Sequence, residues 1–128
     1  MSNKEVRNTY KIESDTNLGE VQIADEVVAI IAGIAAMEVD GVSSMAGTTA
    51  KEIIAKLGKK HLSKGVNVDI LEGVATVELS LNLSYGKNIK NTTLKVQERV
   101  KTAIETMTGL TVADVNIRVA GVDMPEEE

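Results

Sequence analysis

The stretch from Tyr85 to Val122 constrains the fold most, because a helical repeat in it ends at a glycine and an alternating pattern follows at once. Residues at steps of three or four lie on one face of a helix, and here they are Ile89, Thr93, Val96, Val100, Ile104 and Met107. Gly109 stands where a helix end needs positive φ, so the helix is predicted to stop near Thr108. The alternation beyond it is typical of a half-buried strand. Its apolar members are Val115, Ile117 and Val119.

Residues 25–39 form another predicted helix, because this apolar stretch is longer than a usual strand. Asp25 and Glu26 in its first turn suit the positive end of the helix dipole. Its larger residues recur at helical steps and are expected to face a sheet: Val27, Ile30, Ile31, Ile34 and Met37. Its small residues are expected to let the helix approach another backbone closely: Ala29, Ala32, Gly33, Ala35 and Ala36.

Alternating apolar and polar residues predict the strands. Residues 66–70 and 77–85 alternate on either side of Glu72-Gly73, which predicts a β-hairpin. Shorter strands are predicted over 19–23 and 42–45. Residues 49–57 indicate a short amphipathic helix, and residues 59–64 a solvent-exposed loop.

These elements predict one α+β domain over residues 19–122. The order β-α-β-β-β-α-β gives a two-layer sandwich, with a mainly antiparallel sheet and two main helices on one face. A chain of 128 residues suits one domain. Residues 1–18 are expected to form a flexible N-terminal arm on which Tyr10 and Ile12 dock, and residues 123–128 an acidic disordered tail.

The composition argues against side-chain catalysis and metal binding. The chain has no cysteine and one histidine, His61, so a thiolate site, a disulfide or a His-based cluster within one chain is excluded. The ten glycines form no G-x-G or Walker pattern. We therefore expect no catalytic residue, no metal and no cofactor, and a protein that is not an enzyme.

Nothing in the sequence predicts secretion or a membrane span. The first twenty residues lack the apolar region of a signal peptide. The longest apolar run, residues 27–37, is shorter than the ~20 residues that cross a bilayer. A cytoplasmic location is expected.

The net charge of −5 is unevenly distributed, with an acidic first third followed by two basic stretches. Nine basic residues are candidate contacts to an acidic protein or an anionic surface, with ordinary solvated side chains as the simpler interpretation: Lys51, Lys56, Lys59, Lys60, Lys64, Lys90, Lys95, Arg99 and Lys101. Nucleic acid is the least favoured partner, because single-strand binders add aromatic platforms and this chain has only Tyr10 and Tyr85. The asymmetry also suggests a homo-oligomer, in which the acidic part of one copy meets the basic part of another.

Several short segments, taken in order, carry a family resemblance. They are Gly19 to Ile23, Ile31 to Ala36, Glu38 to Val42, Gly65 to Val68, Tyr85-Gly86, Val96-Gln97 with Val100, Met107 to Leu110, Val115 to Ile117, and Gly121-Val122. In this order and spacing the chain resembles the alkaline shock protein family, the envelope stress response proteins of Gram-positive bacteria. The resemblance runs from Gly19 to Val122.

The resemblance implies a scaffold or adaptor of cell-envelope homeostasis. Such a protein acts by protein–protein contact and is held at the membrane by a small membrane-embedded anchor protein. Relatives with acidic C-termini are tied to fatty-acid synthesis, so a regulator that binds a soluble enzyme of that pathway is the alternative. The matching residues are interpreted as structural markers: Tyr85, Gly86, Gln97, Gly109 and Asn116. Gln97 is expected to cap a strand edge or to face a partner.

Overall fold

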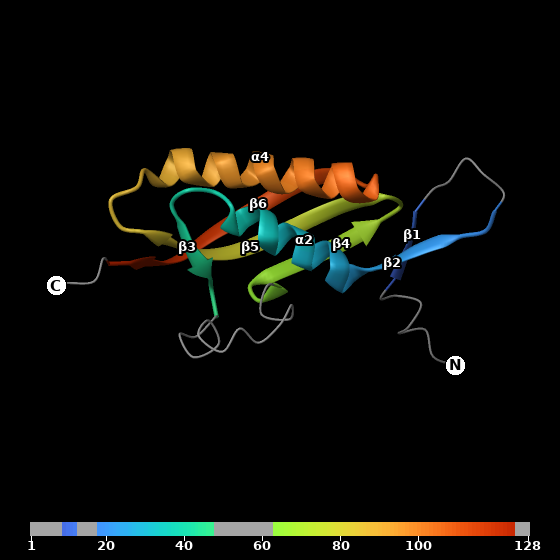
Figure 1. Cartoon of the computed structure of the whole chain (residues 1–128), viewed down its shortest axis with the longest axis horizontal. Helices are drawn as coiled ribbons and strands as arrows, with labels where there is room; N and C mark the ends of the chain where they lie inside the picture. Colours follow the sequence, from blue (N-terminus) through green and yellow to red (C-terminus); the bar gives the residue numbers. More distant parts are fainter. Residues whose placement is uncertain (1–8, 13–17, 48–62, 125–128) are drawn as a thin grey trace.

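The structure, a computed structural model, describes residues 9–12, 18–47 and 63–124. Its elements are β1 (Thr9–Ile12), β2 (Val21–Ala24), α2 (Asp25–Met37), β3 (Val42–Met45), β4 (Val66–Leu71), β5 (Val74–Ser84), α4 (Ile89–Thr108) and β6 (Thr111–Asp123). Figure 1 shows α2 and α4 on one face of the main sheet. The predicted α+β sandwich is confirmed. The helix predicted over residues 49–57 lies outside the described residues.

Strand β5 is the centre of the main sheet. Its first half pairs antiparallel with β4 and its second half antiparallel with β3, so these two strands share one edge of β5 end to end. Ser80 joins them, because its N–H donates to Gly65 O at 2.8 Å and its carbonyl accepts from Ala46 N at 2.9 Å. The opposite edge of β5 pairs with β6 along its whole length.

The pairing of β5 with β6 is parallel, and it is the longest in the sheet. Helix α4 provides the long crossover that a parallel pair requires. Two register shifts, at Ala75/Thr76 and Leu81/Asn82, bend β6 relative to its partner. The other two pairings of the main sheet are antiparallel, so two of its three pairings fit the predicted mainly antiparallel sheet. The described residues hold one further pairing, of β1 with β2, which is also antiparallel.

The core lies between the helices and the sheet. Its largest fully buried side chains come from β5, α4 and α2: Leu79, Leu81, Leu83, Ile104, Val28, Val77, Val96 and Val100. Asn88 caps α4 by accepting a 2.8 Å hydrogen bond from Asn91 N. Gly109, with φ of 79°, ends this helix after Thr108, as predicted.

The buried face of α4 differs from the predicted one at both ends. Ile89 and Met107 are 51% and 68% exposed. The buried residues follow one another at steps of four: Thr92, Val96, Val100, Ile104 and Thr108. Because four residues exceed one helical turn, this stripe winds around the helix, which packs against both α2 and β6.

The predicted orientation of α2 is wrong for three of its five larger residues, whereas Ile31 is buried as predicted. The small residues face the core, together with Val28 and Ile31. Val27, Ile34 and Met37 point outward instead and are 44%, 42% and 38% exposed. The reason is steric, because α2 packs against α4, β4 and β3, and small side chains allow close approach to other backbones, as the sequence predicted for them.

Strand β2 occupies the position of the first predicted strand, but it pairs with β1 in a separate two-stranded sheet. Strand β1 falls within the arm predicted over residues 1–18, where no strand was expected. Tyr10 of β1 packs against the core. At the other end, β6 extends to Asp123, the first residue of the predicted tail.

Candidate functional site

The predicted basic residues of α4 do not form one free positive surface. Arg99 is held by Glu38 at 3.0 Å, and Lys101 by Glu105 at 2.9 Å. Lys90 and Lys95 are exposed on the same helix. Lys64 lies just before β4, whereas the lysines predicted with it lie outside the described residues: Lys51, Lys56, Lys59 and Lys60.

The family markers take different positions. Gly86 and Gly109 have positive φ, 95° and 79°, which explains glycine there. Tyr85 is 63% exposed, and Asn116 is exposed on β6. Gln97 donates to Val115 O at 3.0 Å. Of the two alternatives predicted for Gln97, the structure shows the strand-edge cap.

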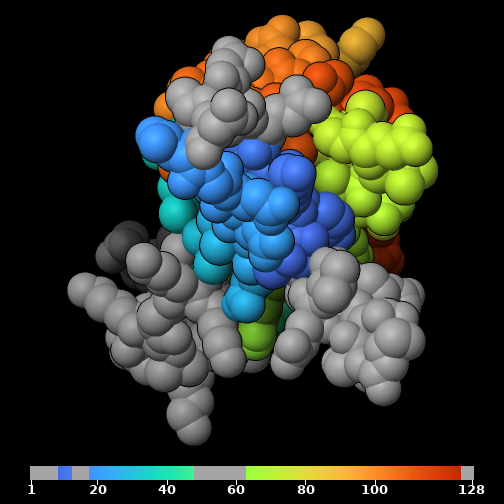
Figure 2. All heavy atoms as spheres, turned by 90° about the vertical axis from the view of Figure 1, so that its right-hand side faces the viewer, coloured from blue at the N-terminus to red at the C-terminus, as the bar shows by residue number. Residues whose placement is uncertain are grey.

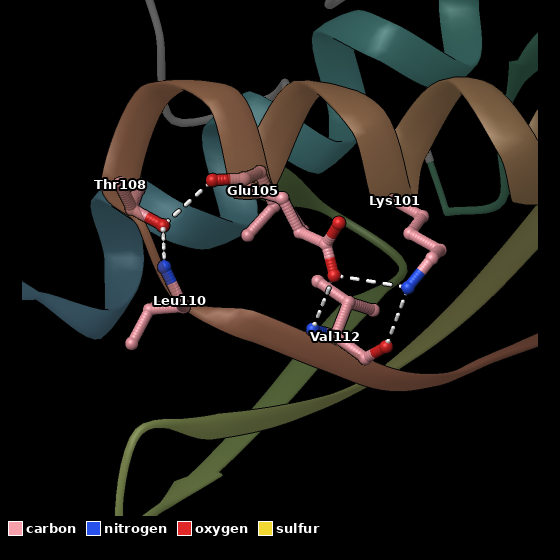
Figure 3. A network of polar contacts seen from close by, with 6 residues as sticks. Lys101, Glu105, Thr108, Leu110 and Val112 are labelled. Atoms are coloured by element: carbon pink, nitrogen blue, oxygen red, sulfur yellow. Dashed lines mark hydrogen bonds and ion pairs between the residues drawn. The ribbon is translucent and has the colours of Figure 1, made fainter.

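A separate polar network joins the second half of α4 to the start of β6 (Figure 3). Glu105 Oε2 accepts from Val112 N at 3.0 Å, and Lys101 Nζ donates to Val112 O at 3.1 Å. Both backbone groups of Val112 therefore have side-chain partners on the outer edge of β6. The hydrogen bond from Val112 N, followed by that from Lys101, lowers the pKa of Glu105 below its ordinary value. This edge is blunted against pairing with another strand.

Thr108 connects the end of α4 to the start of β6. Its hydroxyl donates to Ile104 O at 2.6 Å and accepts from Leu110 N at 3.1 Å. Thr108 is buried, so both of its interactions are satisfied without water. The polar network between α4 and β6 thus holds the helix to the strand. Its polar groups already have partners within the protein, so none is left free to react.

The end of the molecule seen in Figure 2 carries a hollow of about 800 Å³. It lies where β1, the tip of the β4–β5 hairpin and the C-terminal end of α4 meet. Its walls include Lys11, Glu72, Val74 and Leu110. Lys11 is already paired with Glu20 at 3.4 Å.

The outward face of α2 is apolar. The face consists of Val27, Ile30, Ile34 and Met37, and we call it the α2 apolar face. A helix at a protein surface normally turns polar residues to solvent, but between Glu26 and Glu38 this helix has none. The absence of a polar residue from this run was the signal in the sequence, which was interpreted only as burial.

Residues 9–12, 18–47 and 63–124 hold neither a metal-binding cluster nor a membrane-spanning helix. No group of three His, Cys, Asp or Glu side chains there is arranged to hold a metal ion. No helix in that part of the chain is long and apolar enough to cross a membrane.

The chain is similar to proteins of one family over most of its length. Residues 13–124 match the model of the alkaline shock protein 23 (ASP23) family, described as having a cell envelope-related function. YqhY of Bacillus subtilis (strain 168) is 39% identical over 108 residues, which cover 84% of this chain and 80% of that protein. A stress response regulator gls24 homolog of Streptococcus pyogenes serotype M3 is 26% identical over 128 residues, 99% of this chain and 72% of that protein.

Among solved structures, one of MamM-CTD is similar with a TM-score of 0.48 and 11% identity. The similar part covers 80% of this chain and 100% of the MamM-CTD chain. A likeness at this level supports no conclusion about function or assembly.

Proposed function

Because this chain belongs to the alkaline shock protein 23 family, we propose that it is a non-enzymatic scaffold or adaptor of the envelope stress response. It acts by protein–protein contact at the cytoplasmic side of the membrane, where a membrane-embedded anchor protein holds it. The family has a cell envelope-related function. The mode of action is our inference from the surface of α2.

The observation that supports contact with a protein is the α2 apolar face. Val27, Ile34 and Met37 are each more than a third exposed, and Ile30 between them is half-buried. Apolar side chains clustered on one exposed helix face gain free energy when a partner removes them from water. A partner helix that packs along α2 would bury all four.

The ends of α2 favour a protein over a lipid surface as the partner. The apolar face is bounded by Asp25 and Glu26 at one end and by Glu38 and Asp40 at the other. Amphipathic helices that enter anionic membranes carry lysine and arginine beside their apolar face. The carboxylates of Asp25 and Glu26 repel anionic headgroups, and those of Glu38 and Asp40 are paired with Arg99 and Lys87. Neither end therefore has the excess of basic charge that an anionic membrane requires, and we infer that the anchor reaches this face as protein.

The experiment compares two matched substitutions at exposed apolar positions. Ile34→Glu places a charge in the α2 apolar face, and Leu94→Glu places the same charge on α4, where Leu94 is 52% exposed. Each variant replaces the wild-type protein in its native host. After mild crosslinking, detergent extraction and nuclease treatment, captured proteins are identified.

The scaffold proposal predicts a small integral membrane protein with the wild type and with Leu94→Glu, and its loss with Ile34→Glu. Recovery of a soluble fatty-acid-synthesis enzyme without any membrane protein would favour the regulator instead. Nuclease-sensitive material as the main product would favour a nucleic-acid binder. If both variants retain the membrane protein equally, the α2 apolar face is not the surface that contacts it.

A further inference from the structure

The face of the main sheet opposite the helices has a distinct chemistry. On β5, every second residue turns toward this side: Val74, Thr76, Glu78, Ser80, Asn82 and Ser84. Residues directly opposite each other on paired strands share a face, so the register also places residues of β4 and β6 there. We call this surface the open face.

The register arranges the open face in rows across β4, β5 and β6. One row is Leu71, Val74 and Thr111, the next is Asp69, Thr76 and Asp114, and the third is Asn67, Glu78 and Asn116. Asp69 and Asp114 therefore flank Thr76 on its two sides, and Glu78 lies in the adjoining row. Three carboxylates of like charge are held on neighbouring positions of a rigid surface.

These three carboxylates have no ion-pair partner in the part of the chain that the structure describes, although the register places one basic residue, Arg118, in the next row of the open face, opposite Ser80. Asp69, Glu78 and Asp114 are all exposed, and none forms an ion pair within the described residues. On the helix side of the molecule, by contrast, Glu38 and Glu105 each have a basic partner. The open face thus has unpaired negative charge, while much of the charge of the helix layer is balanced.

An exposed apolar pair lies beside the carboxylates. Leu71 and Val74 are directly opposite each other across the hairpin, and they are 72% and 41% exposed. The tip of this hairpin is visible in yellow-green in Figure 2. Exposed apolar side chains bordered by charged groups are typical of the anchor position in a protein interface.

We propose that the open face binds a basic amphipathic segment of a partner protein. An apolar side chain of that segment packs on Leu71 and Val74, and its lysine or arginine side chains approach Asp69, Glu78 and Asp114. Nucleic acids and anionic lipids are repelled by the same carboxylates. This surface lies on the opposite side of the molecule from the α2 apolar face, so it gives the adaptor a second partner of different chemistry.

The test uses two short synthetic amphipathic peptides with identical leucine positions, one with lysine and one with glutamate at the remaining positions. Binding to the full chain is measured by fluorescence anisotropy at physiological ionic strength. The lysine peptide is expected to bind and the glutamate peptide is not. Vesicles rich in phosphatidylglycerol are expected not to bind, and their binding through the open face would contradict the proposal.

Two triple variants with equal change in net charge distinguish binding at the open face from non-specific electrostatic attraction. The first, Asp69→Asn with Glu78→Gln and Asp114→Asn, should weaken binding of the lysine peptide at least about tenfold. The second removes the same charge from the helix side: Glu38→Gln, Asp40→Asn and Glu98→Gln. It should leave the affinity within about twofold. Equal losses in the two variants, or no binding by the wild type, would overturn the proposal.

A second readout on the wild-type chain does not depend on any variant folding. Backbone amide resonances are followed by NMR as the lysine peptide is added. The expected shifts fall on β4, β5 and β6 around Asp69, Glu78 and Asp114, and shifts confined to α2 or α4 would contradict the open face. Binding here and capture through Ile34 are independent, so either proposal can fail alone.

Discussion

Gln97 of α4 donates its side-chain N–H to the carbonyl of Val115 on β6, at 3.0 Å. This contact joins the middle of the helix to the outer edge of the strand that follows it in the chain. It explains why a polar residue stands on α4 close to the core position Val96, which is fully buried. A glutamine side chain here is long enough to supply one hydrogen bond that a neighbouring strand would otherwise donate to this edge.

Removing this contact is expected to lower stability modestly. Gln97→Ala leaves the Val115 carbonyl without its partner, and a typical hydrogen bond contributes about 0.5–1.5 kcal/mol. Because the contact is only partly buried, water can replace part of it, and the loss should lie at the lower end. Urea denaturation measures it, with Thr102→Ala on the exposed side of α4 as the control. Because alanine has a higher helix propensity than either replaced residue, a Gln97→Ala variant that loses no more stability than Thr102→Ala would show that the hydrogen bond contributes nothing.

Glu105 is expected to make stability depend on acidity. Its folded-state pKa is lowered by the hydrogen bond from Val112 N and then by that from Lys101. A carboxyl group with a depressed folded pKa stabilises the protein above its unfolded pKa, ordinarily 4.5. That contribution is lost as the pH falls through the folded pKa.

The free energy of unfolding should therefore fall more steeply below pH 4.5 in the wild type than in Glu105→Gln. NMR titration of the Glu105 side-chain carboxyl carbon gives the folded pKa directly. A titration midpoint at or above the ordinary value would contradict the network in Figure 3.

The hairpin turn at Glu72-Gly73 offers a stabilising substitution. Glu72 has φ of 53° and Gly73 has φ of 79°, the conformation of a type I′ turn that favours Asn-Gly. Glutamate in this region is strained, at a cost of about 1 kcal/mol. Glu72→Asn should raise the free energy of unfolding by about that amount. Thermal denaturation measures the change, and a decrease would mean that the Glu72 side chain makes a stabilising contact.

Gly65 is expected to tolerate no side chain. A Cβ there would lie 2.9 Å from Ser80 O and 3.1 Å from Ala46 O, at the junction of β3 and β4 on β5. Gly86 is the matched control, because it has φ of 95° but a Cβ at that position would meet nothing within 4 Å. Gly86→Ala should cost about 1 kcal/mol for its positive φ, and Gly65→Ala at least about 2 kcal/mol more. Urea denaturation measures the free energy of unfolding of both variants. If the two variants lose similar amounts, the junction of β3 and β4 can widen to accommodate a Cβ.

The sequence predicted elements whose side-chain period was clear. The alternation around Leu79, Leu81 and Leu83 located β5, and Gly109 located the end of α4. The period did not locate the buried face of α2, because residues 27–37 are apolar all around the helix and only side-chain size distinguishes their faces. The alanines pack inward because they allow close approach to α4.

The open face depends on strand register, which a sequence alone does not give. Asp69, Glu78 and Asp114 lie on three strands, and only the pairing with β5 brings them onto adjoining rows. Conversely, the basic residues that were prominent in the sequence are partly neutralised in the fold. Arg99 meets Glu38, which is 61 positions away in the chain.

The most direct test of the central claim is the distribution of the protein between membrane and soluble fractions of its native host, measured for the wild type, Ile34→Glu and Leu94→Glu. Contact between the α2 apolar face and a membrane-held partner predicts recovery of the wild type and Leu94→Glu with the membrane, and of Ile34→Glu in the soluble fraction. Recovery of Ile34→Glu with the membrane, or of the wild type entirely in the soluble fraction, would contradict it.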